Sequence, residues 1–230
     1  MTLDKAEALH CSKVLRMKIN DIIHLTDGKG KLCEAQIINP DKNAFVVQIT
    51  KETIMPRERD YFLHIAISPT KNIQRFEWFL EKTTEIGIDS IIPLMCKNSE
   101  RRIIKEERLR KVIISAMKQS HKVWLPEIKT FTGFEQLVNQ DFSGNKFIAT
   151  GSEPSGNHLG RLCGKGLDNL ILIGPEGDFD QEELKLAMKK NFIPVSLGKS
   201  RLRTETAGVV ACHTVNLINS LIPNLNSNPE

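Results

Sequence analysis

The pattern of apolar and polar positions changes near residue 60. Before it, short apolar runs alternate with turn residues, and the predicted strands are 22–25, 32–38 and 44–49. A glycine-containing hairpin turn at 26–30 and a second turn at 39–43 connect these strands. Short strands joined by tight turns predict a small β-barrel domain over residues 1–60, with a linker at 52–60.

Beyond residue 60, apolar runs alternate with segments of helical periodicity, which predicts an α/β domain over residues 61–230. The predicted strands are 61–68, 91–95, 147–150, 170–173 and 195–197. The predicted helices are 73–86, 106–120, 181–190 and 204–221. Because the later strands are continuously apolar, we expect a parallel sheet that is covered on both faces. Asp180 and Glu183 form the capping box of the third helix.

Three of the predicted strands end at a glycine. These glycines are Gly151, Gly174 and Gly198, separated by 23 and 24 residues, about one β-α unit each. Ligands of open α/β sheets bind beyond the carboxyl ends of the strands, and glycine lets the backbone approach a ligand closely. The spacing therefore predicts that three loops meet at one ligand-binding rim, although each glycine alone is also compatible with an ordinary turn.

Familiar nucleotide and hydrolase motifs are absent from the sequence. Residues 198–200 resemble the end of a P-loop, but Ile193 stands where that motif requires glycine. Gly164 and Gly166 have no third glycine after them and precede a strand, so a Rossmann dinucleotide site is unsupported. The chain has no G-x-S-x-G elbow, and its six histidines lack the spacing of metal ligands.

Composition narrows the class of protein further. At 230 residues, with 40% hydrophobic and 26% charged residues, the chain has an ordinary globular composition. No run approaches the roughly 20 apolar residues of a membrane span, and no signal peptide is visible. The five cysteines form no C-x-x-C pair, which argues against structural zinc and a disulfide framework. We therefore expect a cytoplasmic protein with no membrane segment and no metal.

The net charge of +4 is unevenly distributed. Residues 97–122 hold nine Lys or Arg against three Glu, an excess of +6, which is more than that of the whole chain. Such clustering is typical of a phosphate-binding surface, and a solvated helix face gives the same pattern. Contact with nucleic acid is therefore one of two interpretations of this segment.

Residues 172–177 (LIGPEG), 197–198 (LG) and 202–207 (LRTETA) resemble the SPOUT-class RNA methyltransferases. The sequence is most similar to the ribosomal RNA small subunit methyltransferase E family, which methylates N3 of a uridine in 16S rRNA. The resemblance covers nearly the whole chain, and residues 13–16 with 27–30 resemble that family's PUA-like barrel. Asp178 departs from the family, which usually has a second glycine there, and the shorter N-terminus predicts an incomplete first barrel strand.

The resemblance implies a parallel sheet with a deep C-terminal trefoil knot, a homodimer whose active site borders the interface, and S-adenosylmethionine as cofactor. It also implies that 16S rRNA, or the small ribosomal subunit, is the partner. Backbone groups of a rim would hold the cofactor's adenine and ribose. The rim residues are Leu172, Gly174, Glu176, Gly177, Leu197, Gly198, Leu202, Arg203, Thr204, Glu205, Thr206 and Ala207.

For the reaction, the hypothesis is that Arg203 stabilises charge on the uracil carbonyls and that Glu205 accepts the N3 proton. RNA is expected to contact a set of cations, which are Lys13, Arg16, Arg101, Arg102 and Lys105. Two alternatives stay open at this point. One is a SPOUT-type methyltransferase that acts on tRNA, and the other is a non-catalytic RNA-binding assembly factor.

Overall fold

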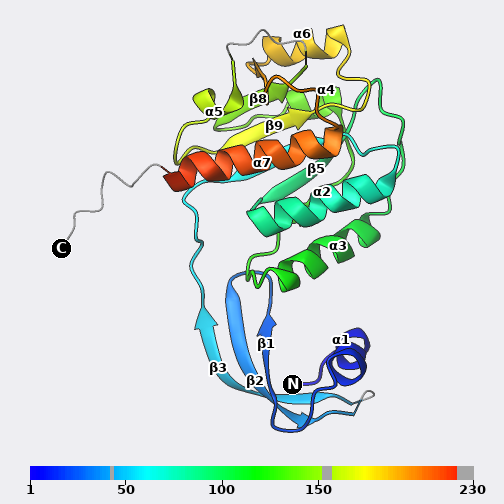
Figure 1. The fold of residues 1–230 in the computed structure, drawn as a ribbon, viewed down its shortest axis with the longest axis vertical. Coiled ribbons are helices and arrows are strands. Elements are labelled where there is room, and N and C mark those ends of the chain that lie inside the picture. The colour runs from blue at the N-terminus through cyan, green and yellow to red at the C-terminus, as the bar shows by residue number, and fades with distance from the viewer. Residues whose placement is uncertain (42–43, 152–156, 222–230) are drawn as a thin grey trace, which may run out of the picture. The chain divides into compact units, whose positions relative to one another are not determined.

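The structure, a computed structural model, describes residues 1–41, 44–151 and 157–221 (Figure 1). The chain divides into two compact units. The first comprises Met1–Glu58 with His121–Leu125, and the second comprises Arg59–Ser120 with Pro126–Glu230. The predicted turn at 39–43 extends to residues 42 and 43, which lie outside the described residues.

The first unit is a short helical segment packed on an antiparallel sheet. Its elements are α1 (Lys5–Leu9), the π-helical turn η1 (His10–Val14), β1 (Ile22–Thr26), β2 (Lys31–Asn39) and β3 (Val46–Ile54). Strand β2 pairs with both β1 and β3. The Asp4 side chain caps α1 by accepting hydrogen bonds from the N–H groups of Ala6 and Glu7, both at 2.9 Å. The core contains Ala8, Cys11, Ile23, Ala35, Ile37, Phe45 and Val47.

This sheet differs in two ways from the sequence expectation. Within the described residues, β1 and β3 do not pair with each other, so the three strands form an open sheet and not a closed barrel. Strand β3 also extends to Ile54, so the first three residues of the predicted 52–60 linker are strand.

A segment distant in sequence completes the first unit at the hairpin turn after β1. The Gly30 N–H donates to the Val123 carbonyl at 2.9 Å, and the Leu125 N–H donates to the Gly28 carbonyl at 2.9 Å. Gly30 has a φ of 97°, and a Cβ there would lie 2.5 Å from the Trp124 ring. The turn therefore requires glycine both for its backbone conformation and for the close approach of Trp124.

The second unit is built on a parallel sheet with the order β10-β8-β9-β4-β5-β6, and β7 pairs with β5 beside it. Its strands are β4 (Leu63–Ile67), β5 (Ser90–Met95), β6 (Glu127–Ile128), β7 (Thr132–Gly133), β8 (Asn145–Ala149), β9 (Asn169–Ile173) and β10 (Ile193–Val195). Its helices are α2 (Ile73–Ile86), α3 (Glu106–Gln119), α4 (Phe134–Val138), α5 (Leu159–Leu162), α6 (Gln181–Lys189) and α7 (Thr204–Leu221). The parallel α/β sheet that the sequence predicts is confirmed.

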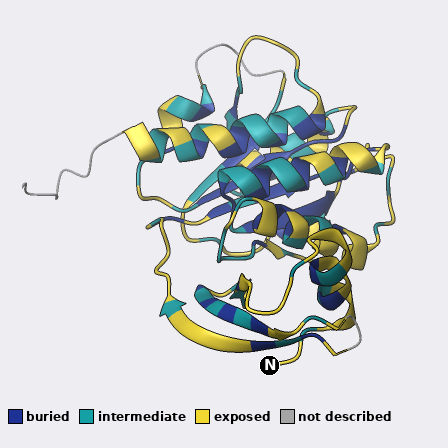
Figure 2. Ribbon diagram, turned by 60° about the horizontal axis from the view of Figure 1, so that its bottom comes forward, coloured by how far each residue is buried: buried dark blue, intermediate teal, exposed yellow. Residues whose placement is uncertain are grey.

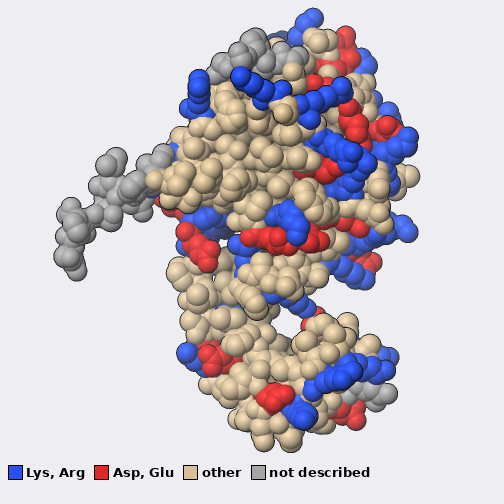
Figure 3. Space-filling model, in the orientation of Figure 1, with Lys and Arg blue, Asp and Glu red and all other residues tan. Residues whose placement is uncertain are grey.

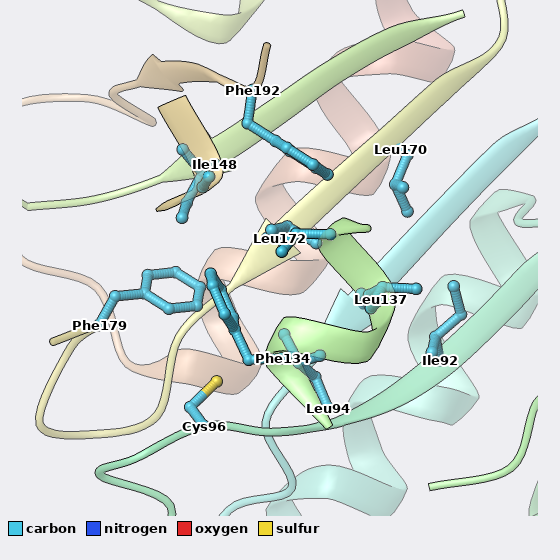
Figure 4. Close-up of a cluster of buried hydrophobic side chains, with 13 residues drawn as sticks. Ile92, Leu94, Cys96, Phe134, Leu137, Ile148, Leu170, Leu172, Phe179 and Phe192 are labelled. Atoms are coloured by element: carbon cyan, nitrogen blue, oxygen red, sulfur yellow. The ribbon is translucent and has the colours of Figure 1, made fainter. Parts of the chain in front are cut away.

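Helices cover both faces of this sheet. Helices α2, α3 and α7 lie on one face, and α4 and α6 lie on the other (Figure 1). Figure 2 shows that the buried residues are concentrated in the central strands between these layers. On the α4–α6 side, the rings of Phe134 and Phe179 pack with their centroids 5.5 Å apart (Figure 4). Phe179 thereby fixes the chain that follows β9.

The predicted elements agree with the structure where local signals are strong. Helix α2 has the predicted bounds, and the capping box of Asp180 and Glu183 is present. The strand predicted at 195–197 has the wrong bounds, because β10 covers 193–195 and includes Pro194. β10 is the edge of the sheet, and an edge strand tolerates proline because no inner neighbour needs its missing N–H. The sequence analysis missed the short helices α1, α4 and α5.

None of the helices in the described parts of the chain is long and apolar enough to cross a membrane. All five cysteines are buried, and their thiols form no disulfide. Burial raises the pKa of the Cys96 thiol far above its usual range, so this group stays neutral.

The close packing of α7 on α2 gives a stability test at Gly208. A Cβ at Gly208 would lie 2.5 Å from Cε2 of the buried Phe79 and 2.9 Å from Cδ1 of Ile67. Gly208→Ala should therefore destabilise the protein by about 1–3 kcal/mol, even though alanine favours helix by roughly 1 kcal/mol. Urea denaturation measures this change.

Gly133→Ala is the matched control. A Cβ there meets no atom within 4 Å, and the φ of −69° suits any residue. Its stability should stay within about 0.5 kcal/mol of the wild type. Equal stabilities for the two variants would contradict the packing argument.

Candidate functional site

A pocket of about 890 Å³ opens where three neighbouring strands end. Strands β8, β9 and β10 finish at Ala149, Ile173 and Val195, and the loops after them form most of the wall. The starts of α5 and α7 complete it. The lining residues are 149–151, 173–176 and 196–202 with His158, Arg161, Asp178, Thr204 and Ala207. The structure thus brings together the three glycine-containing loops that the sequence singles out.

The loop after β9 folds back as a tight turn, in which the Asp178 N–H donates to the Pro175 carbonyl at 3.0 Å. Asp178 has a φ of 62°, in the left-handed region where glycine is favoured. Glycine adopts this conformation at lower cost than aspartate does. The Asp178 carboxylate accepts a hydrogen bond from the Phe179 N–H at 2.8 Å, and weaker ones at 3.4 Å from Thr150 and the Gly151 N–H. Asp178 therefore connects the loops after β8 and β9.

A second loop, residues 96–101 after β5, supports the β9 loop from outside the pocket. The Lys97 N–H donates to the Glu183 carboxylate at 2.8 Å, and the Lys97 ammonium lies 3.1 Å from the Asp180 carboxylate. The Asn98 side-chain amide donates to the Asp178 carbonyl at 3.1 Å. Hydrogen bonding to backbone and to Lys97 holds the pKa of Asp180 below its usual range, so its cap stays ionised.

Arg101 acts on the pocket through the backbone of a third loop. Its Nε donates to the Thr70 carbonyl at 3.0 Å, and its Nη2 donates to the Lys71 carbonyl at 2.6 Å. The Lys71 N–H in turn donates to Oε1 of Glu176 at 3.0 Å, and Glu176 lines the pocket. Because the guanidinium fork fixes two consecutive carbonyls, it holds the Lys71 N–H where Glu176 needs it.

The loop after β10 is held by its own short contacts. The Ser196 hydroxyl bonds the Gly198 carbonyl at 3.0 Å and accepts from the Gly198 N–H at 3.1 Å. Gly198 has a φ of 131°, which L side chains rarely adopt. The Leu159 N–H donates to the Ser196 carbonyl at 3.0 Å, which ties α5 to this loop.

Glu205, in the first turn of α7, is a buried carboxylate with one incompletely satisfied oxygen. Its residue is only 6% exposed, and its Oε1 lies 3.8 Å from Nε of Arg75 on α2. Its Oε2 is buried and has no hydrogen-bond partner in the described chain. A buried acceptor without a hydrogen bond costs free energy, so Glu205 is a candidate functional residue.

The predicted rim residues divide into two groups. Those that line the pocket are Gly174, Glu176, Leu197, Gly198, Leu202, Thr204 and Ala207. Those outside the lining are Leu172, Gly177, Arg203, Glu205 and Thr206. Leu172 is fully buried in the core, which explains its place outside the lining. Arg203 is exposed, and its neighbours in sequence, Leu202 and Thr204, line the pocket. The sequence does not single out His158, Arg161 and Arg201, because the short helix α5 and the loop after β10 carry no periodic signal.

The predicted RNA-contacting residues have different environments. In the first unit, Lys13 in η1 and Arg16 just after it are exposed. In the second unit, Arg102 and Lys105 are exposed. Arg101 is half-buried, and its guanidinium donates hydrogen bonds to the Thr70 and Lys71 carbonyls. The geometry therefore leaves Arg102 and Lys105 more accessible than Arg101.

Comparison with known proteins now places the chain. The family model described as an RNA methyltransferase domain matches residues 57–216, and that of an RNA methyltransferase PUA domain matches residues 3–50. Ribosomal RNA small subunit methyltransferase E of Buchnera aphidicola (strain APS) is 31% identical over 210 residues, which cover 88% of this chain and 81% of that protein. The chain belongs to this methyltransferase family.

Two solved structures of the family resemble the chain over nearly its whole length. A probable rRNA-methyltransferase from Porphyromonas gingivalis has a TM-score of 0.89 at 40% identity and covers 95% of this chain and 93% of its own. A ribosomal RNA small subunit methyltransferase E from Neisseria gonorrhoeae, solved with S-adenosyl methionine bound, has a TM-score of 0.80 at 28% identity, with coverages of 92% and 89%. The family resemblance of the sequence is confirmed.

The link from Arg101 to Glu176 can be tested on the backbone. Lysine cannot donate to two carbonyls in a fixed fork, so Arg101→Lys should loosen Lys71. We expect hydrogen exchange of the Lys71 amide to accelerate about tenfold, as for the loss of roughly one hydrogen bond. Arg102→Lys, on an exposed neighbour, is the control and should leave that exchange rate unchanged; equal rates in the two variants would contradict the link.

Proposed function

We propose that the protein is an S-adenosylmethionine-dependent methyltransferase that methylates N3 of a uridine in 16S rRNA of the small ribosomal subunit. The observation that carries the proposal is the pocket at the carboxyl ends of β8, β9 and β10, which seven of the expected rim residues line. The RNA methyltransferase family assignment supports the same reaction class. The related Neisseria gonorrhoeae protein, solved with S-adenosyl methionine bound, supports the cofactor.

The pocket has the size and the lining that this cofactor requires. Its volume of about 890 Å³ is that of a small-molecule site. A Cβ at Gly198 would meet no atom within 4 Å, which leaves the backbone of this loop open, and Glu176 and Asp178 place carboxylates in the wall. S-adenosylmethionine supplies a methyl group on a sulfonium cation, and carboxylates in the wall favour such a cation. The residues present therefore fit the group.

The chain's own contribution to the reaction is positioning and charge stabilisation. Uracil N3 carries a proton and becomes nucleophilic when that proton is lost or shared, with negative charge spreading onto the carbonyls. We assign Arg203 to this charge: it is exposed at the start of α7, and its guanidinium has no bonding partner in the described chain. We assign Glu205 to the proton, since its buried Oε2 is a free acceptor.

The proposal extends to the assembly and to the RNA surface. It includes the trefoil knot at the C-terminal end, a homodimer whose interface borders the pocket, and contact of RNA with Lys13, Arg16, Arg102 and Lys105, with Arg101 as part of the same set. The exposed Leu217 of α7 offers apolar surface that a second copy would cover. Analytical ultracentrifugation tests the dimer.

The deciding experiment is methyl transfer from labelled S-adenosylmethionine to small ribosomal subunits that lack the modification. We expect label in 16S rRNA, and digestion to nucleosides should identify it as N3-methyluridine. Transfer to tRNA, but not to subunits, would favour a tRNA methyltransferase. Cofactor binding without transfer to either substrate would favour a role in assembly.

Arg203→Ala should separate chemistry from cofactor binding. Loss of one preorganised charge-stabilising donor typically lowers the rate by about 10²-fold. We expect that decrease in single-turnover methyl transfer, with the calorimetric affinity for S-adenosylmethionine within a few-fold of the wild type. Lys185→Ala, which removes an exposed cation of α6 outside the pocket and outside the proposed RNA-contacting set, is the control for the rate of the chemical step. Parallel losses of binding and rate in Arg203→Ala would contradict the assigned role.

A further inference from the structure

Four cationic side chains stand at the mouth of the pocket without a counter-charge. Arg161, Lys199 and Arg201 line the pocket, and Arg203 directly follows its lining residue Leu202. All four residues are exposed. Within residues 1–41, 44–151 and 157–221, their side chains make no hydrogen bond, ion pair or ring contact.

Several other cations of the second unit form ion pairs. The Lys97 ammonium lies 3.1 Å from the Asp180 carboxylate, and the Lys71 ammonium lies 2.8 Å from the Glu100 carboxylate. The Arg108 guanidinium forms an ion pair with Glu77. The two carboxylates of the pocket lining, Glu176 and Asp178, accept hydrogen bonds from the Lys71 and Phe179 N–H groups and form no ion pair with these cations. The four cations outnumber the two carboxylates of the lining, so an excess of positive charge remains at the mouth.

The sequence of the loop between β10 and α7 concentrates this charge. Residues 196–203 contain three cations at alternating positions and no acid. Figure 3 shows Lys and Arg side chains gathered across this end of the second unit. The deep part of the pocket is different, because Ile173, Gly174 and Thr204 are buried and carry no cation. The cations thus lie at the mouth, and these buried lining residues are uncharged.

We propose that Arg161, Lys199 and Arg201 bind the phosphates that flank the nucleotide entering the pocket, beside Arg203 with its separate role toward the base. A guanidinium fork matches phosphate oxygens, and an ammonium serves as a point charge for them. Several exposed cations fit a chain of phosphates better than the single carboxylate of a cofactor held deeper in the pocket. This inference rests on the proposed function, because it takes RNA as the substrate that reaches the pocket.

The test uses the triple variant Arg161→Gln, Lys199→Gln and Arg201→Gln in the full-length protein, with Arg203 unchanged. The control is the triple variant Lys129→Gln, Lys185→Gln and Lys189→Gln, three exposed cations outside the pocket and outside residues 97–122. The affinity for 16S rRNA transcribed in vitro is measured by filter binding from 0.05 to roughly 0.3 M KCl, the range in which released counterions change affinity most. The affinity for S-adenosylmethionine is measured by calorimetry.

We expect the slope of log affinity against log salt to become shallower by about 2 in the rim variant, at roughly 0.7 per phosphate contact on single-stranded RNA. The RNA affinity at 0.15 M salt should fall roughly tenfold to a hundredfold, with the cofactor affinity unchanged. The control variant should keep the wild-type slope.

An unchanged slope in the rim variant would overturn the inference. A weakened cofactor affinity with an unchanged RNA slope would also overturn it, and would assign these cations to the cofactor's carboxylate. Failure of the proposed function would give a different result: the wild-type protein would bind no S-adenosylmethionine and transfer no methyl group. The salt dependence of its RNA binding could still be measured and compared with that of the rim variant.

Discussion

The pocket depends on a tight turn that cannot satisfy its own polar groups. Between Pro175 and Asp178 the chain reverses with one internal backbone hydrogen bond, and a residue other than glycine occupies the left-handed conformation. Such a turn is strained in isolation, because buried or half-buried polar groups must find partners and a side chain at positive φ costs free energy. The partners come from Lys71, Asn98 and Thr150, which belong to three other loops.

The parallel topology makes this support possible. Strands β4, β5, β8 and β9 run in the same direction, so the loops that follow them emerge at one edge of the sheet. Residues far apart in sequence, such as Asn98 and Asp178, therefore become neighbours. On the far side of the turn, the Phe179 ring packs against Phe134 and beneath Gly174, where a Cβ would lie 3.1 Å from the ring. The loop is fixed by polar contacts above and by packing below.

Local signals explain what the sequence predicts and what it misses. Helix α2 has its predicted bounds because its apolar positions follow helical spacing and Gly87, with a φ of 127°, ends it; the structure adds the Asn72 cap at its start. The bounds of β10 are predicted wrongly because Pro194 argues against a strand unless the strand is known to lie at the edge of the sheet. The attachment of 121–125 to the first unit and the role of Arg101 are invisible in the sequence, since both depend on backbone partners distant along the chain.

The charged side chains on the two walls of the pocket differ in whether other parts of the chain already hold them by hydrogen bonds. Glu176 and Asp178 accept hydrogen bonds from backbone groups, so their carboxylates are held in place before any ligand arrives. A preorganised wall costs little entropy on binding and suits a small cofactor of constant shape. Lys199 and Arg201 are exposed and make no such contacts within the described residues. Long side chains of this kind can follow a phosphate backbone of variable path, so the two walls suit two different ligands.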